Sequence, residues 1–162
     1  MENKDESLRR ATERIARGAV DNVTVVQCNV GRFHAAFDIG VCLHACGVAT
    51  DLVLVKCLAA SAAFVISPCC YGAVRNGHSV NYPRSRAFRS AGLEYPEYVA
   101  VGHAADRTAG KSVEGRTSMC LVDSDRCQLA QQFGYTTRLF VMNPPSCSPK
   151  NHILTGQPAS TD

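Results

Sequence analysis

The chain has 162 residues, enough for one domain that buries roughly 70% of the surface its unfolded form exposes. An apolar fraction of 46% and a charged fraction of 19% are typical of globular domains, which excludes a disordered or fibrous protein. The net charge of +3 is too small to indicate a polyanionic partner by itself. No apolar stretch is long enough to cross a bilayer, and the first residues contain no signal-peptide core, so we expect no membrane association and a cytoplasmic location. The nine cysteines are an odd number without a leader, and we interpret them as reduced thiols.

The first quarter of the chain predicts one helix and two strands. Apolar side chains repeat at helical spacing over residues 2–17, and Gly18 is expected to close this helix in the left-handed conformation. Residues 23–26 and 37–43 are short β-branched or apolar runs bounded by turn residues. Such runs predict buried strands.

The rest of the chain continues this alternation. Residues 50–60 predict a helix with Thr50 as its N-cap, and residues 63–66 predict a strand that ends before a proline. Residues 119–133 then predict a helix ending at Gly134, followed by strands over 136–142 and 152–155. Strands that alternate with helices predict an open α/β fold with a mostly parallel sheet covered on both faces.

Histidine and cysteine follow two consecutive predicted strands. His44 and Cys46 come after the first of these strands, and Cys69 and Cys70 come after the second. Because ligands bind at the carboxyl ends of parallel strands, we expect these four side chains to converge there. They match a zinc ligand set, or they offer a low-pKa thiolate to an electrophile. The His-x-Cys and Cys-Cys spacings lack the two intervening residues of a zinc knuckle, so the sequence favours buried packing and no bound metal.

One segment, residues 72–92, contains no acidic side chain. Its basic and aromatic residues are interleaved, as in segments that grip a phosphate backbone and stack on bases. The candidate residues for binding a nucleic acid are Arg75, Arg84, Arg86 and Arg89. Four arginines give this segment only a modest positive charge. The sequence therefore favours a solvated loop with a short helix over a nucleic-acid-binding segment.

Residues 105–112 fit a loosened phosphate-loop pattern. In such proteins a helix follows the loop and points its N-terminus at the phosphates, whereas here Gly115 is expected to interrupt that helix. We therefore exclude nucleotide hydrolysis.

Three segments carry a resemblance to a known family: DIGVCLHACGVATD at 38–51, SPCCYG at 67–72 and PSCSPKN at 145–151. The chain resembles, essentially end to end, the methyltransferase-like domain in the C-terminal part of the glutathione S-transferase C-terminal domain-containing proteins. Its His-x-Cys-Gly and Cys-Cys motifs are more distantly similar to S-adenosylmethionine-dependent methyltransferases, including ones that modify tRNA. The resemblance implies a Rossmann-like sheet whose last strand runs antiparallel.

The resemblance also implies roles for individual residues. Glu2 stands where an acidic residue contacts the ribose of S-adenosylmethionine, and Asn29 stands where a side chain faces the adenine. His44 lies where the catalytic motif of many methyltransferases follows the fourth strand and is a third candidate for cofactor contact. The Asn-Pro-Pro-Tyr signature is absent there, so the resemblance does not indicate which group accepts the methyl. The candidates for catalysis are His44, Cys46, Cys69 and Cys70.

In this family a first strand and a Gly-rich loop hold the methionine part of the cofactor, and both should precede Glu2. We therefore expect a partial, N-terminally truncated methyltransferase-like domain over residues 1–156 and a frayed tail over 157–162. We also expect this chain alone to bind S-adenosylmethionine weakly or not at all and to be inactive. The strand over 37–43 should then present an apolar, unpaired edge.

Three hypotheses follow for the function. The first is a partial S-adenosylmethionine-dependent methyltransferase domain whose substrate the sequence does not identify, with RNA as one candidate. The alternative is a noncatalytic module that binds RNA or protein on the same fold, and the third is a structural zinc-binding protein. The sequence does not predict an oligomeric state.

Overall fold

A computed structural model describes residues 1–77, 79–107 and 112–159. The chain divides into two compact units, residues 1–36 and residues 37–162. Each unit has its own elements and is described by itself below. None of the helices in the described ranges is long and apolar enough to span a membrane.

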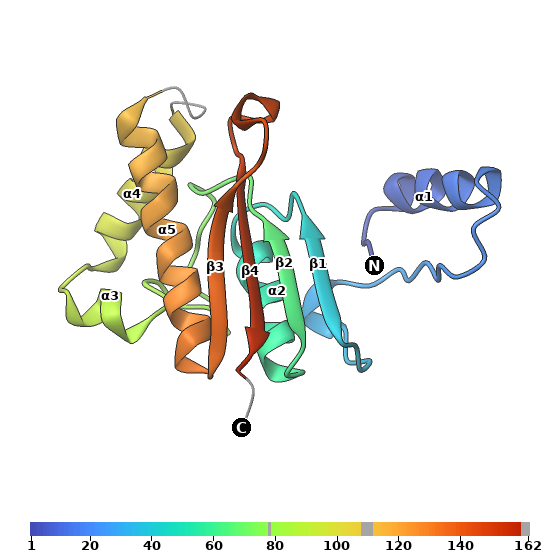
Figure 1. Cartoon of the computed structure of the whole chain (residues 1–162), viewed down its shortest axis with the longest axis horizontal. Coiled ribbons are helices and arrows are strands. Elements are labelled where there is room, and N and C mark those ends of the chain that lie inside the picture. Colours follow the sequence, from blue (N-terminus) through green and yellow to red (C-terminus); the bar gives the residue numbers. More distant parts are fainter. Residues whose placement is uncertain (78, 108–111, 160–162) are drawn as a thin grey trace. The chain divides into compact units, whose positions relative to one another are not determined.

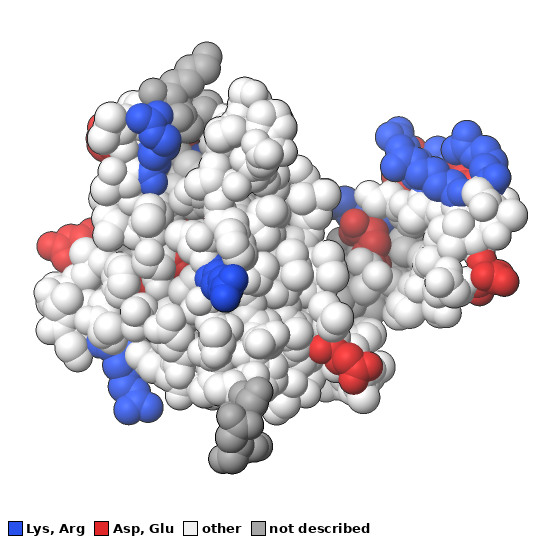
Figure 2. Space-filling view, in the orientation of Figure 1, with Lys and Arg blue, Asp and Glu red and all other residues white. Residues whose placement is uncertain are grey.

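The first unit contains the helix α1 (Asp5–Arg17) and the 3-10 turn η1 (Val30–Arg32). Ion pairs join residues three or four positions apart along α1, and Figure 2 shows the basic side chains of this helix, all arginines, in blue. The helix has no buried residue, so these pairs and its favourable end charges stabilise it. It ends at Gly18, which has a right-handed φ of −82° in place of the expected left-handed one.

The strand predicted over residues 23–26 is wrong. These residues form no ladder, and all three valines in this segment are exposed. A single parallel bridge joins Glu2 to Gln27, with Glu2 N–H donating to the Val26 carbonyl at 3.1 Å. A β-branched run becomes a strand only when a neighbouring strand pairs with it, and within this unit only that one bridge forms.

The second unit is built on a mixed four-stranded sheet (Figure 1). Its strands, in the spatial order β1-β2-β4-β3, are β1 (Ile39–Leu43), β2 (Ala63–Ser67), β4 (His152–Pro158) and β3 (Tyr135–Val141). β1 and β2 are parallel, whereas β4 is antiparallel to both β2 and β3. The last strand is therefore antiparallel, as the resemblance implies. Three of the four strands, β1, β2 and β3, share one direction, as predicted for a mostly parallel sheet; because β4 lies between β2 and β3, two of the three pairings are antiparallel.

Helices cover one face of this sheet. The core on that face joins α2 (Val48–Ala59) and α5 (Val113–Gln132) to the strands; its members include Leu54, Phe64 and Leu154, each no more than 1% exposed. The remaining elements, which extend or connect this layer, are α3 (Arg86–Ser90), α4 (Tyr95–Arg107) and η2 (Pro145–Cys147). α4 packs on α5 and was not predicted. Several residues of α4 are small, so the sequence does not show the regular spacing of large apolar side chains that predicts a helix.

The opposite face of the sheet is not covered by any element of this unit among the described residues. β1 is an edge strand, and its side chains on that face are exposed, with Val41 at 76%. Val65 and Phe140 on the neighbouring strands are also exposed. Figure 2 shows few charged side chains over the sheet. The predicted cover on both faces is therefore wrong for this unit, and the expected apolar, unpaired edge is present.

The ends of some elements differ from the sequence prediction. Gly47, with a φ of +56°, occupies the N-cap of α2, and Thr50 lies inside the first turn. Gly115 lies within α5, where it does not interrupt the helix; residues 108–111 of the phosphate-loop pattern lie outside the described residues. β4 extends through Pro158, two residues into the predicted tail, and residues 160–162 lie outside the described ranges.

Candidate functional site

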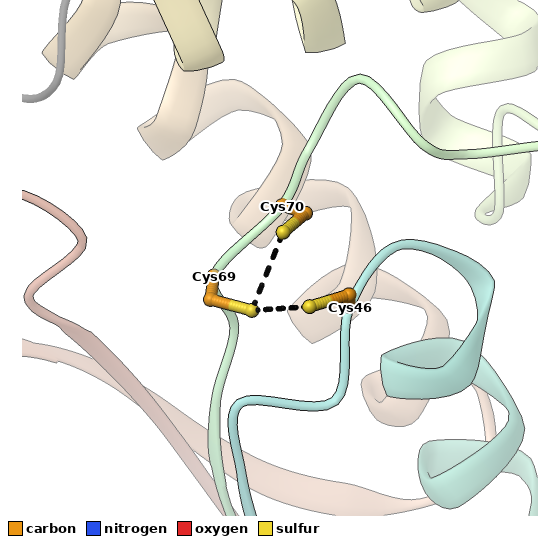
Figure 3. A group of neighbouring side chains, drawn as sticks. All are labelled: Cys46, Cys69 and Cys70. Atoms are coloured by element: carbon orange, nitrogen blue, oxygen red, sulfur yellow. Dashed lines mark hydrogen bonds between the residues drawn. The ribbon is translucent and has the colours of Figure 1, made fainter.

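Three thiols meet at the carboxyl ends of β1 and β2 (Figure 3). The Sγ atoms of Cys46 and Cys69 are 2.9 Å apart, and those of Cys69 and Cys70 are 3.5 Å apart. All three sulfur atoms lie within 4.8 Å of one another. Cys46 is exposed, and the other two are half-buried. The structure therefore brings together three of the four side chains whose convergence we expected.

His44 is the fourth, and its ring is not among the mutually close donor atoms found in the described part of the chain. Its backbone has a φ of +59°, in the left-handed region that non-glycine residues seldom adopt. That conformation turns the chain sharply at the end of β1, where His44 N–H donates to the Ser67 carbonyl at 3.2 Å. The His44 side chain is exposed and stays outside the group of three sulfur atoms, although its position after β1 predicted that it would join them.

Backbone contacts hold the two cysteine loops against each other. Gly47 N–H donates to the Cys70 carbonyl at 2.9 Å. A side chain at Gly47 would collide with the backbone of Ala73, because an added Cβ would lie 2.4 Å from its carbonyl oxygen. Only glycine combines this close approach with a positive φ.

A carboxylate from α4 pins the second loop. Asp106 accepts hydrogen bonds from the N–H groups of Tyr71 at 3.0 Å and Gly72 at 2.7 Å. It also pairs with Lys150 Nζ at 2.9 Å. Burial raises the pKa of Asp106, but these hydrogen bonds lower it by more, so the carboxyl is ionised at neutral pH. The two residues that follow Cys70 are thereby fixed in position.

The environment of the thiols disfavours a nucleophilic role for two of them. Burial, together with the Cys46 and Cys70 thiols, raises the pKa of Cys69 far above its ordinary value. Contact with the Cys46 thiol, together with burial, raises the pKa of Cys70. A reactive cysteine needs a lowered pKa and a positive neighbour. Within this cluster, Cys69 and Cys70 therefore do not fit the low-pKa thiolate that the sequence left open.

Glu2 and Asn29, the other candidates for cofactor contact, both lie in the first unit. The bridge between Glu2 and Gln27 places them at the ends of adjacent segments. Oε1 of Glu2 accepts the N–H groups of Asn3 at 2.8 Å and Lys4 at 3.0 Å, and these bonds lower the pKa of its carboxyl. Asn29 Oδ1 accepts Gly31 N–H at 3.0 Å. Asn29 lines an open hollow of about 280 Å³, together with Asn3, Gln27, Cys28 and Arg32.

The four arginines proposed to bind a nucleic acid do not form one exposed group. Arg84 is buried, and its Nε lies 3.3 Å from Oδ1 of Asp51. Arg89 Nη1 donates to the carbonyl of Pro83 at 2.7 Å and to that of Arg84 at 2.9 Å. Arg75, Arg86 and Arg89 are exposed. Arg84 is therefore unavailable to a phosphate, because its charge neutralises a buried carboxylate.

Sequence reasoning missed a buried polar network beneath the cysteine loops. Arg126 of α5, 1% exposed, donates to Asp51 through Nε at 3.2 Å and Nη2 at 2.8 Å, and to Asp123 through Nη1 at 3.0 Å. The Tyr71 hydroxyl donates to Oδ2 of Asp123 at 2.7 Å, and His152 Nδ1 lies 2.8 Å from the same atom. The network ties Tyr71, which follows Cys70, to α2, α5 and β4.

The same network fixes the segment before α3. Asp125 accepts the N–H groups of Arg84 at 2.6 Å and Ser85 at 2.8 Å, and the Tyr82 hydroxyl donates to Asp51 at 2.7 Å. Aspartates and an arginine at helical spacing in α5 were the available signal. Their burial could not be predicted, because the partners on other elements are distant in sequence.

Part of this chain is similar to a known class of domain. Residues 1–77, which include the three clustered cysteines, match a family model described as a methyltransferase domain. The match supports a methyltransferase-like domain, and the mixed α/β architecture is consistent with one.

Nearly the whole chain is similar to glutathione S-transferase C-terminal domain-containing proteins. It is 42% identical to the protein from Bos taurus and 45% identical to that from Xenopus laevis, over 98% of this chain and 26% of each relative. A homolog from Drosophila melanogaster is 39% identical over 97% of this chain and 28% of its own length. The chain thus spans about a quarter of the length of these curated relatives. No solved structure is detectably similar to the chain.

Proposed function

We propose that the chain is part of an S-adenosylmethionine-dependent methyltransferase-like domain whose first unit contacts the nucleoside end of the cofactor. The observation that carries the proposal is the pairing of Glu2 with Gln27, which places Glu2 and Asn29 on adjacent segments; the hollow is lined by Asn29 and by Asn3, the residue next to Glu2. The match of residues 1–77 to a methyltransferase domain supports the same assignment.

The free atoms of these two side chains suit a nucleoside. Both backbone N–H groups that Glu2 caps bind its Oε1, which leaves Oε2 to accept a hydrogen bond from a ribose hydroxyl. Asn29 uses Oδ1 to cap η1, which leaves its amide N–H groups to donate to an acceptor nitrogen of adenine. The hollow is lined by polar side chains that orient a polar ligand.

When bound, S-adenosylmethionine supplies an electrophilic methyl group on its sulfonium sulfur. The residues of this chain contribute to holding the adenosine, and we assign none of them to methyl transfer. Two side chains make a small share of the contacts that a cofactor of this size needs, so binding is expected to be weak, with a Kd on the order of 1 mM, or about −4 kcal/mol.

Ligand-observed NMR of S-adenosylmethionine with the 162-residue chain tests the proposal, because saturation transfer detects weak binding. We expect transfer to the adenine and ribose protons. Glu2→Gln keeps an oxygen acceptor for the helix N-terminus and removes only the charge, and it should reduce transfer to the ribose. Asn29→Ala should reduce transfer to the adenine.

The matched control is Asp21→Asn, which removes an exposed carboxylate elsewhere in the first unit. Its saturation transfer should equal that of the unmodified chain. Absence of transfer at millimolar cofactor, or equal transfer in all three variants, would overturn the proposal.

A further inference from the structure

The geometry of the cysteine cluster points to a metal site: we propose that Cys46, Cys69 and Cys70 bind one zinc ion through three thiolates. This inference does not rest on the proposed function, since it concerns only the second unit and no methyl transfer. The sequence favoured packing because free cysteine is among the most buried residue types. Here Cys46 is exposed and the other two are half-buried, so burial does not account for their clustering.

The distances between the sulfur atoms fit one shared ion. Zinc–sulfur bonds of about 2.3 Å in a tetrahedral site place the sulfurs roughly 3.8 Å apart. The two closer pairs are at 2.9 and 3.5 Å, and all three atoms lie within 4.8 Å of one another. Side-chain rotations that move each sulfur by roughly 1 Å or less are therefore enough to accommodate the ion.

The chemistry of the donors selects a thiophilic metal. Three sulfurs with no carboxylate in the group favour zinc over magnesium or calcium, which prefer oxygen. The Cys69 thiol lies within hydrogen-bonding distance of the Cys46 and Cys70 sulfurs, which are weak partners. On binding, three S–Zn bonds form and three thiol protons leave to solvent. The exposure of Cys46 leaves the fourth coordination position open to water.

The loops that carry the sulfurs are fixed without the metal. The Gly47–Cys70 hydrogen bond at 2.9 Å joins the two loops, and Asp106 holds the residues after Cys70. Figure 3 shows Cys46 on one loop facing Cys69 and Cys70 on the other. Such a site loses little conformational entropy when the ion binds, and this distinguishes it from a chance meeting of mobile side chains.

Metal analysis of the full 162-residue chain tests the site. Reduced protein is loaded with zinc chloride, dialysed and analysed for zinc; we expect about one zinc per chain, as for a single three-sulfur site. The metal-free protein titrated with Co²⁺ should develop sulfur-to-cobalt charge-transfer absorption. Cys46→Ser and Cys69→Ser should each lower retained zinc at least tenfold and abolish that absorption.

The matched control is Cys147→Ser, which removes an exposed thiol outside the cluster and should retain zinc. Because the Cys46 side chain is exposed, Cys46→Ser should keep the far-ultraviolet circular dichroism of the parent, which separates loss of the site from loss of the fold. No retained zinc and no charge-transfer absorption in the parent chain would overturn the proposal. Equal loss of zinc in Cys147→Ser and Cys46→Ser would do so as well.

Discussion

Replacing Arg126 by Met removes the cation at the centre of the buried network while keeping a side chain of similar length. Three hydrogen bonds disappear, two to Asp51 and one to Asp123, and both carboxylates are 0% exposed. Breaking a buried ion pair from one side costs about 3–5 kcal/mol, because the remaining charge is left without compensation. Arg84 still lies 3.3 Å from Asp51, so we expect the lower end of that range, about 3 kcal/mol.

Urea unfolding followed by circular dichroism measures this loss. A domain has a net stability of roughly 5–15 kcal/mol, so a loss of about 3 kcal/mol is a large shift of the midpoint. The control is Arg86→Met, which changes an exposed arginine and should alter the free energy of unfolding by no more than about 0.5 kcal/mol. A loss below about 1 kcal/mol in Arg126→Met, or equal losses in both variants, would refute the reasoning.

The difference between the parent and Arg126→Met should depend on pH. Burial raises the pKa of Asp51, but Arg126 and Arg84 lower it by more, to below its ordinary value of 3.8. Ionised Asp51 therefore stabilises the parent above pH 3.8, and this contribution is lost as the pH falls through the lower folded pKa. In the variant burial dominates and ionised Asp51 is unfavourable. The difference in unfolding free energy should therefore be largest at neutral pH and shrink as the pH falls toward 4.

Two further predictions concern the surfaces of the second unit. Val41→Lys places a charge on the exposed edge strand β1, and we expect less aggregation by light scattering because such a charge blocks edge-to-edge pairing; unchanged scattering would show that this edge does not mediate association. If RNA is the partner, we expect contacts from the exposed Arg75 and Arg86, because the guanidinium of Arg89 already donates to the Pro83 and Arg84 carbonyls. Changing both to Ala should then reduce the slope of log affinity for tRNA against log salt by about 2, and an unchanged slope would exclude them.

Local sequence patterns predicted most elements of the second unit. The run over 63–66 is β2, the helix predicted to end near Gly134 is α5, and the last apolar run is β4. The resemblance implied that this last strand is antiparallel. These elements were predictable because each buries side chains at the period of its own secondary structure.

Tertiary structure decided the pairing. Residues 23–26 have the composition of a strand but only a single bridge beside them, whereas the similar run in β1 pairs with β2 along five residues. Hydrogen bonds to a neighbouring strand are not encoded in a strand's own composition. For the same reason the place of β4 between β2 and β3 was not readable from periodicity.

Part of the candidate site could also be predicted from the sequence, and part depended on the tertiary structure. Motifs after two neighbouring strands were enough to predict that Cys46, Cys69 and Cys70 converge, since parallel neighbours end at one edge. The left-handed turn at His44 and the burial of Arg84 depend on backbone geometry and on partners far away in sequence. Arg84 pairs with Asp51, 33 positions earlier, and a charged side chain reads as solvated until the carboxylate that compensates its burial is known.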